Sequence, residues 1–189
     1  EALDDNDYNV GLEASLRNTG RWDLRPGVGV KASSSPDPFV RLRAIRYAQL
    51  DQWLMRFAAG ATEFVDDGTV LQMRVDFERK IQPDWLFRSA SRARYRDDKD
   101  RIDLLQQLTL FNKINDRVGI AYDVGVQADD DPDWEVDRYF VQTRVRFRAY
   151  RKWLFLELKP QVVFRESEDY DPSYLLSIRA DVVFGERYR

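Results

Sequence analysis

Three arginines alternate with apolar residues in the segment FVQTRVRFRAYRKW, residues 140–153. Arg144, Arg146 and Arg148 take every second position, and Val145 and Phe147 stand between them. Successive side chains of a β-strand point to opposite faces, so the segment predicts one face of guanidinium groups and one of hydrocarbon. Such a face either meets a passing anion or pairs with carboxylates of the next strand, such as Glu157.

The same charged face recurs along the chain. Its basic members are Arg74, Arg88, Arg92, Arg94, Arg144, Arg146, Arg148, Lys159 and Arg179, with Arg25, Lys31, Arg41, Arg43 and Arg56 on earlier strands; its acidic members are Asp76, Glu78, Glu157 and Asp181. Two interpretations stay open. The arginines line a lumen and guide anions, or ion pairs with the acidic residues fill that lumen and fix the strand register.

Residue types exclude most catalytic chemistry. The chain has neither histidine nor cysteine, which removes imidazole bases, Ser-His-Asp triads and the favoured zinc ligands. Carboxylates cluster at Asp66–Asp67 and Asp129–Asp131, but these stretches are predicted to be solvated loops. We therefore predict no enzyme, no catalytic residue, no metal site and no cofactor. The net charge of −3 argues against a nucleic-acid partner.

Alternation with a period of two residues runs from end to end and predicts an all-β protein. The expected strands are Tyr8–Asn18, Leu24–Ser33, Phe39–Leu50, Trp53–Phe64, Val70–Ile81, Trp85–Tyr95, Ile102–Ile114, Val118–Gln127, Tyr139–Tyr150, Trp153–Phe164 and Tyr174–Phe184. They exceed the roughly 5–6 residues usual in soluble sheets and fit the about 9–11 of tilted membrane strands. No apolar run is long enough for a membrane helix.

Loops and tryptophans add two regularities. Short turns (LDQ, QPD, NDR, YRK) alternate with longer acidic loops (SSPDP, VDDGT, RDDKDR, ADDDPDWEVDR, RESEDYDPS), as in outer-membrane barrels. A membrane-interface girdle is predicted at the short-turn end, formed by Trp22, Trp53, Trp85 and Trp153. The competing interpretation is a soluble β-sandwich or lipid-carrying barrel, in which the apolar face is the core.

The predicted fold is an antiparallel up-and-down transmembrane β-barrel of about 12 strands, forming a single domain over residues 1–189. Eleven strands are visible, and because both termini of such a barrel share one side, one strand is expected before Glu1. Residues 1–7 are then a loop and residues 185–189 a tail. The alternatives are a barrel that closes with eleven strands and a strand to which part of residues 1–7 contributes. Two places fit poorly: the strand RIDLLQQLTLFNKI is mixed on both faces, and Arg46 falls on the apolar face. A β-bulge or snorkelling to the rim would explain Arg46.

The last strand, YLLSIRADVVFG, resembles the C-terminal β-signal of bacterial outer-membrane proteins at Leu176, Ile178, Val182 and Phe184. The tail GERYR departs from that pattern. The segments DRVGIAYDVGVQADDDP and WLFLELKPQVVFRESEDYDPSYLLSIRADVVFG resemble an uncharacterised family of proteobacterial outer-membrane β-barrel proteins. That resemblance implies residence in the outer membrane of Gram-negative bacteria, among lipid and lipopolysaccharide, and implies no activity.

Together these patterns predict an outer-membrane β-barrel with a basic lumen, acting as a narrow channel for small anionic solutes. The alternative is a non-conducting structural barrel, closed by ion pairs, that binds a partner protein in a larger assembly.

Overall fold

The computed structural model describes residues 8–17, 22–32, 36–131, 133–150 and 153–182. Its strands are β1 (Tyr8–Glu13), β2 (Leu16–Arg17), β3 (Trp22–Ala32), β4 (Asp37–Leu50), β5 (Trp53–Phe64), β6 (Gly68–Gln82), β7 (Trp85–Arg96), β8 (Arg101–Lys113), β9 (Val118–Asp129), β10 (Glu135–Tyr150), β11 (Leu154–Arg165) and β12 (Pro172–Val182). Two short 3₁₀ helices, η1 (Asp97–Lys99) and η2 (Glu166–Glu168), lie in connections. Neither of the two helices in the described residues has the length and apolar character of a membrane span.

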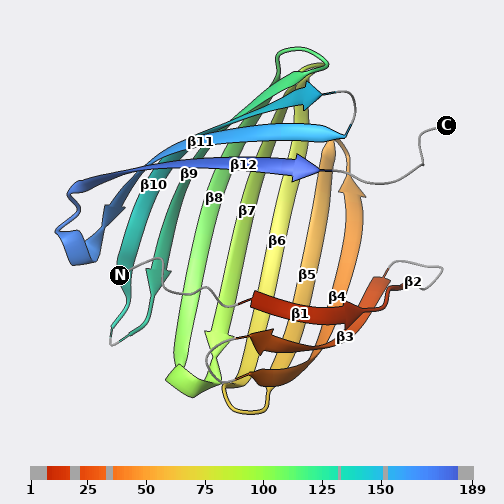
Figure 1. Ribbon diagram of the computed structural model, residues 1–189, viewed down its shortest axis with the longest axis vertical. Coiled ribbons are helices and arrows are strands. Elements are labelled where there is room, and N and C mark those ends of the chain that lie inside the picture. The colour runs from red at the N-terminus through yellow and green to blue at the C-terminus, as the bar shows by residue number, and fades with distance from the viewer. Residues whose placement is uncertain (1–7, 18–21, 33–35, 132, 151–152, 183–189) are drawn as a thin grey trace. The chain divides into compact units, whose positions relative to one another are not determined.

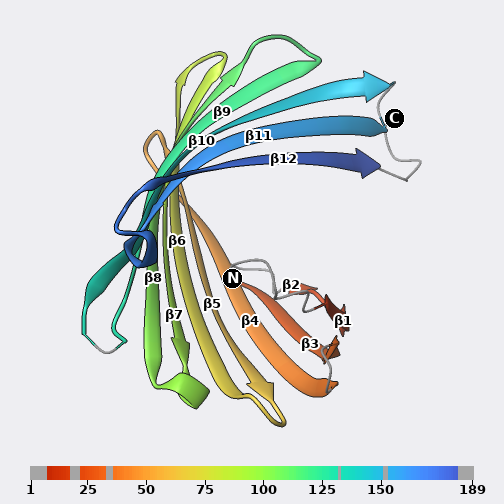
Figure 2. The same ribbon diagram turned by 60° about the vertical axis from the view of Figure 1, so that its left-hand side comes forward.

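The strands form one antiparallel sheet in sequence order, which confirms the predicted up-and-down all-β fold. The order runs from β1 through β3 and each later strand to β12, while β2 pairs only with β3. In Figures 1 and 2, β10, β11 and β12 lie side by side, as do β3, β4 and β5. Each expected strand is found, although the expected end positions 18, 33, 183 and 184 lie outside the described residues. The predicted loop 1–7 and tail 185–189 lie outside them as well.

The first expected strand is interrupted, because its partner carries a proline. β1 and β2 keep the same register against β3, with Glu13 opposite Gly27 and Leu16 opposite Leu24. Between them the amide of Ala14 donates to the carbonyl of Pro26 at 3.0 Å. Proline has no N–H to return that bond, so the pairing loses one rung there.

No bulge accounts for Arg46. The β3–β4 and β4–β5 registers run without a shift across it. Arg46 pairs with Trp22 in register, and its guanidinium lies 5.6 Å from the centre of the Trp22 ring. A cation over an indole face is stabilised by the ring quadrupole. The apolar face therefore accommodates this charge beside an aromatic ring at the start of β3.

One acidic loop is tighter than expected. β6 begins at Gly68, so only Val65–Asp67 connect it to β5. The buried carboxylate of Asp37 accepts hydrogen bonds from the backbone amides of Val65, Asp66 and Asp67 at 2.9, 3.1 and 3.0 Å. The β8–β9 connection, Ile114–Arg117, is longer than this loop. The predicted sorting into short and long connections is therefore wrong at this pair, because the side chain of Asp37 folds the loop.

The chain divides into two compact units. Unit 1 comprises Glu1–Asp76, Ser91–Leu104 and Asp129–Trp134, and unit 2 comprises Phe77–Ala90, Leu105–Ala128 and Glu135–Arg189. Strands β6 to β9 contribute residues to both. Whether the chain acts as the single predicted domain stays a prediction.

Candidate functional site

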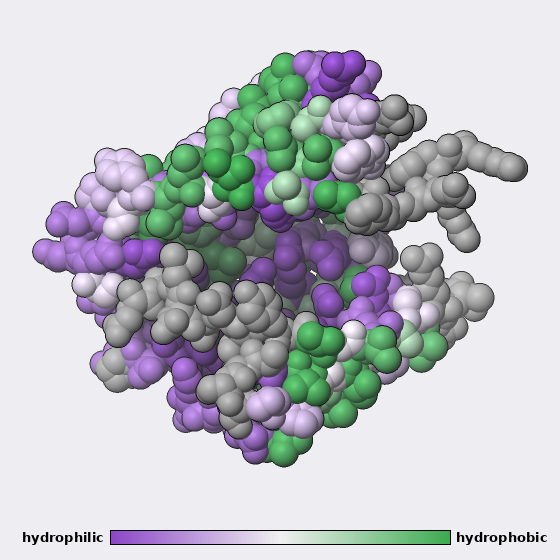
Figure 3. Space-filling view, viewed as in Figure 1, coloured by the Kyte–Doolittle hydropathy of each residue, from purple (hydrophilic) through white to green (hydrophobic). Residues whose placement is uncertain are grey.

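In unit 2 an ionisable side chain is buried as well as apolar ones, whereas many large apolar side chains are exposed. Asp123 has a side chain with no exposed surface, although it is ionisable. Ile178 is 74% exposed and Leu176 is 64% exposed. Figure 3 shows hydrophobic residues gathered over β11 and β12. A soluble sandwich buries its apolar face, whereas a membrane barrel turns that face to lipid.

Unit 1 likewise buries carboxylates beside apolar residues and exposes large apolar side chains. Within β6, Asp76 is 2% exposed, whereas Leu71 and Met73 on the opposite face are 46% and 52% exposed. On β4, Val40 and Leu42 are more than half exposed. Both units therefore favour the membrane interpretation over the soluble sandwich.

An arginine-lined pocket of about 270 Å³ lies on the charged face of unit 1. We call it the arginine pocket. It is lined by Arg41, Arg43, Arg56, Ala58, Ala59, Gly60, Thr62, Gln72, Met73, Arg74 and Arg92. The five guanidinium groups come from four strands, β4 to β7.

Small residues on β5 make room for this pocket. Ala58, Gly60 and Thr62 occupy alternate positions, so they share the charged face. Gly60 lies opposite Arg43 in register. A Cβ on Gly60 would lie 2.9 Å from Cγ of Arg43, closer than side chains pack. The long side chains of β4 and β6 therefore extend over the middle of β5, where the side chains are small.

Carboxylates neutralise only part of the pocket. Asp76 accepts from Nε and the terminal nitrogen of Arg74 at 2.9 and 2.8 Å and lies 3.5 Å from Arg56. Glu13 lies 3.7 Å from Arg43 and also 3.7 Å from Arg25. The two carboxylates are therefore shared among four arginines.

Arg41 and Arg92 form no ion pair within the described part of the chain. The guanidinium of Arg41 lies 5.0 Å from the centre of the Phe39 ring. Its Nε is buried without a hydrogen-bond partner, and so is that of Arg56. The pocket thus carries unneutralised positive charge and unsatisfied donors.

The three arginines of β10 have protein partners. Arg144 donates to Asp123 through Nε and a terminal nitrogen, at 2.8 and 3.0 Å. Arg146 lies 3.2 Å from Asp181, and its guanidinium is 4.9 Å from the centre of the Phe155 ring. Arg148 donates to the backbone carbonyl of Asp116. Their partners thus differ from Glu157, although Glu157 faces Arg146 in register.

The remaining basic residues of the predicted lumen differ in whether they form an ion pair. Arg88 pairs with Glu78, and Arg179 pairs with Asp181 at 2.9 Å and lies 3.9 Å from Glu157. Arg94 has a buried Nε without a partner. For Lys159 the described residues contain no ion pair, and Ser177 lies opposite it. Whether these side chains face a lumen stays a prediction.

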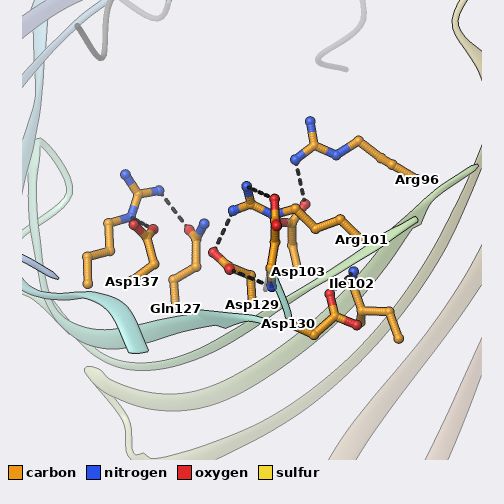
Figure 4. A network of polar contacts seen from close by, with 10 residues as sticks. Arg96, Arg101, Ile102, Asp103, Gln127, Asp129, Asp130 and Asp137 are labelled. Atoms are coloured by element: carbon orange, nitrogen blue, oxygen red, sulfur yellow. Dashed lines mark hydrogen bonds and ion pairs between the residues drawn. The ribbon is translucent and has the colours of Figure 1, made fainter. Parts of the chain in front are cut away.

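An ion-pair chain that the sequence reading missed ties the acidic connections of unit 1. Figure 4 shows Arg96 and Arg101 both bonded to Asp103, at 3.2 and 3.0 Å, and Arg101 bonded to Asp129. Next to Asp129, Asp130 accepts from the amide of Ile102 at 2.6 Å. The start of β8 and the end of β9 are therefore joined by charged side chains that the sequence predicts to be solvated.

A sequence pattern could have revealed many of these pairs. In RVD, RID and RAD, an arginine and an aspartate stand two residues apart on one strand face. The arginine bonds its own strand's aspartate in all three, at 2.9, 3.0 and 2.9 Å for Arg74, Arg101 and Arg179. An arginine without such a neighbour depends on another strand for its partner.

The four tryptophans of the predicted girdle stand at the starts of β3, β5, β7 and β11. Trp22, Trp53 and Trp85 are the first residues of β3, β5 and β7, and Trp153 directly precedes β11. Trp22 and Trp153 are both about 40% exposed, at 39% and 41%. The girdle stays a prediction, since no bilayer is present. Among the described residues no cluster of three or more acidic, histidine or cysteine side chains could hold a metal ion.

Comparison with known proteins supports the fold. No protein-family model and no curated protein sequence matches the chain. A solved structure of the NanC porin matches with a TM-score of 0.61 and 13% sequence identity, over 94% of this chain and 93% of that one. At this identity the match concerns the fold. Together with the exposed apolar face of the sheet, it means that the chain has the fold of a porin-like outer-membrane β-barrel.

Proposed function

We propose that this protein resides in the bacterial outer membrane and conducts small anionic solutes. The observation that carries the proposal is the arginine pocket, where Arg41 and Arg92 have no carboxylate partner within the described residues. Fixed positive charge in a narrow, low-dielectric passage raises the local concentration of anions. Lipid and lipopolysaccharide would contact the apolar face. We propose no catalytic role.

A second candidate is a non-conducting barrel that binds a partner protein. It is favoured by unit 2, where Arg144, Arg146 and Arg148 are all held by internal partners. Ion pairs of this kind fill space and fix register. Conduction is the property that separates the two candidates.

The test is single-channel recording in planar bilayers with a salt gradient. We expect a channel whose reversal potential reports anion preference. The double variant Arg41→Gln/Arg92→Gln should lose much of that preference. The matched control Lys99→Gln/Arg117→Gln removes two positive charges from exposed connections and should retain it.

Reproducible absence of conductance from correctly folded protein would refute the channel and leave the scaffold candidate. Equal anion preference in wild type and the pocket variant would remove the arginine pocket from the pathway.

A further inference from the structure

We propose that the arginine pocket is a saturable binding site for a compact tetrahedral dianion, namely inorganic phosphate or a small phosphomonoester. The inference rests on the proposed anion pathway, because it names the solute class that this pathway recognises. Its physical basis is the number, direction and incomplete pairing of the guanidinium groups.

The donors converge from several directions. Arg41 and Arg43 come from β4, Arg56 from β5, Arg74 from β6 and Arg92 from β7. A carboxylate offers two oxygens in one plane and is well matched by one guanidinium fork. A phosphate offers at least three acceptor oxygens pointing in different directions. Donors from four neighbouring strands therefore suit the tetrahedral anion better.

The charge of the site indicates a dianion. Asp76 is already held by Arg74 and Arg56, and Glu13 is shared between Arg43 and Arg25. Arg41 and Arg92 remain uncompensated within the described residues. Two unpaired guanidinium groups correspond to two negative charges on one ligand.

A purely structural role explains this pocket poorly. Elsewhere in unit 1, Arg101 is paired with both Asp103 and Asp129, whereas Arg94 also has a buried Nε without a partner. Here the Nε atoms of Arg41 and Arg56 are buried and unsatisfied. Unmade hydrogen bonds of buried charged groups are costly, so a ligand that accepts from Arg41 and Arg56 would recover this cost.

Size and neutral polar groups narrow the ligand class further. The volume of about 270 Å³ is just below the roughly 300–1,000 Å³ of typical small-molecule sites. Thr62 and Gln72 add a hydroxyl and an amide to the lining. These groups suit the hydroxyls of a short phosphomonoester, whereas a long anionic chain would exceed the pocket.

The test measures binding without conduction. Inorganic phosphate is titrated by calorimetry into the full chain in detergent micelles, at a pH above the second phosphate pKa and in constant chloride. We expect one saturable site. Affinity should fall at least about tenfold in Arg41→Gln/Arg92→Gln, as for lost charge-assisted hydrogen bonds, and stay within about twofold in Lys99→Gln/Arg117→Gln.

Succinate, a planar-ended dianion, is the competitor that tests geometry. Succinate binding as tight as phosphate overturns the tetrahedral assignment, and so does equal weakening of both double variants. Heat-modifiable migration on gels shows that each variant is folded. Saturable phosphate binding by a barrel that does not conduct overturns the proposed channel alone. Conduction without saturable binding overturns the pocket assignment alone.

Discussion

Replacing Asp123 by asparagine should destabilise the fold more than any other single isosteric change to a carboxylate of unit 2. The Asp123 carboxylate has no exposed surface and accepts from four side chains. Arg144 supplies two hydrogen bonds, Thr109 one, and Gln107 and Gln142 one each, at 2.9 and 3.1 Å. Every donor in this network converges on one side chain.

The expected loss is about 3 kcal/mol in the free energy of unfolding. Removing one partner of a buried ion pair typically costs about 3–5 kcal/mol, because the other charge is left uncompensated. The low end applies because the side chain of Arg144 is 34% exposed and regains some hydration. The introduced amide keeps one acceptor oxygen for Thr109 or Gln107, which also limits the loss.

The assay is reversible urea unfolding in lipid vesicles, followed by tryptophan fluorescence. Asp181→Asn is the matched control, since Asp181 also pairs with arginines, Arg146 and Arg179, but its side chain is 28% exposed. Its loss should be well under half as large. Equal losses in the two variants would refute the reasoning that burial sets the strength of these pairs. A double-mutant cycle that combines Asp123→Asn with Arg144→Gln measures the coupling free energy between these two side chains.

Three further predictions concern the lipid face and the loops. Leu176→Arg places a charge on the apolar face near the middle of β12 and should cost roughly 2–4 kcal/mol in vesicle unfolding, whereas Leu175→Arg, one residue away on the charged face, should cost far less; equal costs would contradict the face assignment. Asp37→Ala should speed amide exchange of Asp66 and Asp67 at least about tenfold, equivalent to about 1.4 kcal/mol, because these two amides lose their acceptor, whereas Val65 keeps the carbonyl of Pro38 as acceptor. Unchanged exchange of Asp66 and Asp67 would show that the loop holds without Asp37. The hydroxyl of Ser173 donates to Glu168 and lowers the pKa of that carboxyl. The ionised carboxylate of Glu168 therefore stabilises the loop fully above its unfolded pKa, and this stabilisation is lost as the pH falls through the lower folded pKa. Proteolysis of the loop should accelerate on acidification in wild type, and the same acid dependence in Glu168→Gln would contradict this.

Local pattern was enough to predict the strands. Side chains of a strand alternate between faces whatever the strand packs against. The alternation therefore located β3 to β12 to within a few residues. The break at Ala14 escaped it, because the cause is Pro26 on the neighbouring strand. The tight loop escaped it as well, because Asp37 reaches it from 28 residues away.

The sequence predicted the strand face of the site's arginines but not which arginines form the pocket. Arg41, Arg43, Arg56, Arg74 and Arg92 fell on the charged face as expected, but the arginines of β10 looked equally suited to an anion. The run FAAGAT on β5 carries the missing information, since small residues between arginine-bearing strands leave a pocket.

Alternation by itself thus determined that this protein has an all-β fold with one charged and one apolar face. Only the tertiary structure decided which of its arginines are free to meet an anion. Register and reach bring Asp123 to Arg144 across 21 residues, while Arg41 and Arg92 meet no carboxylate in the described chain. The physical reason is that face depends on a residue's own position in its strand, whereas charge neutralisation depends on distance to residues of other strands.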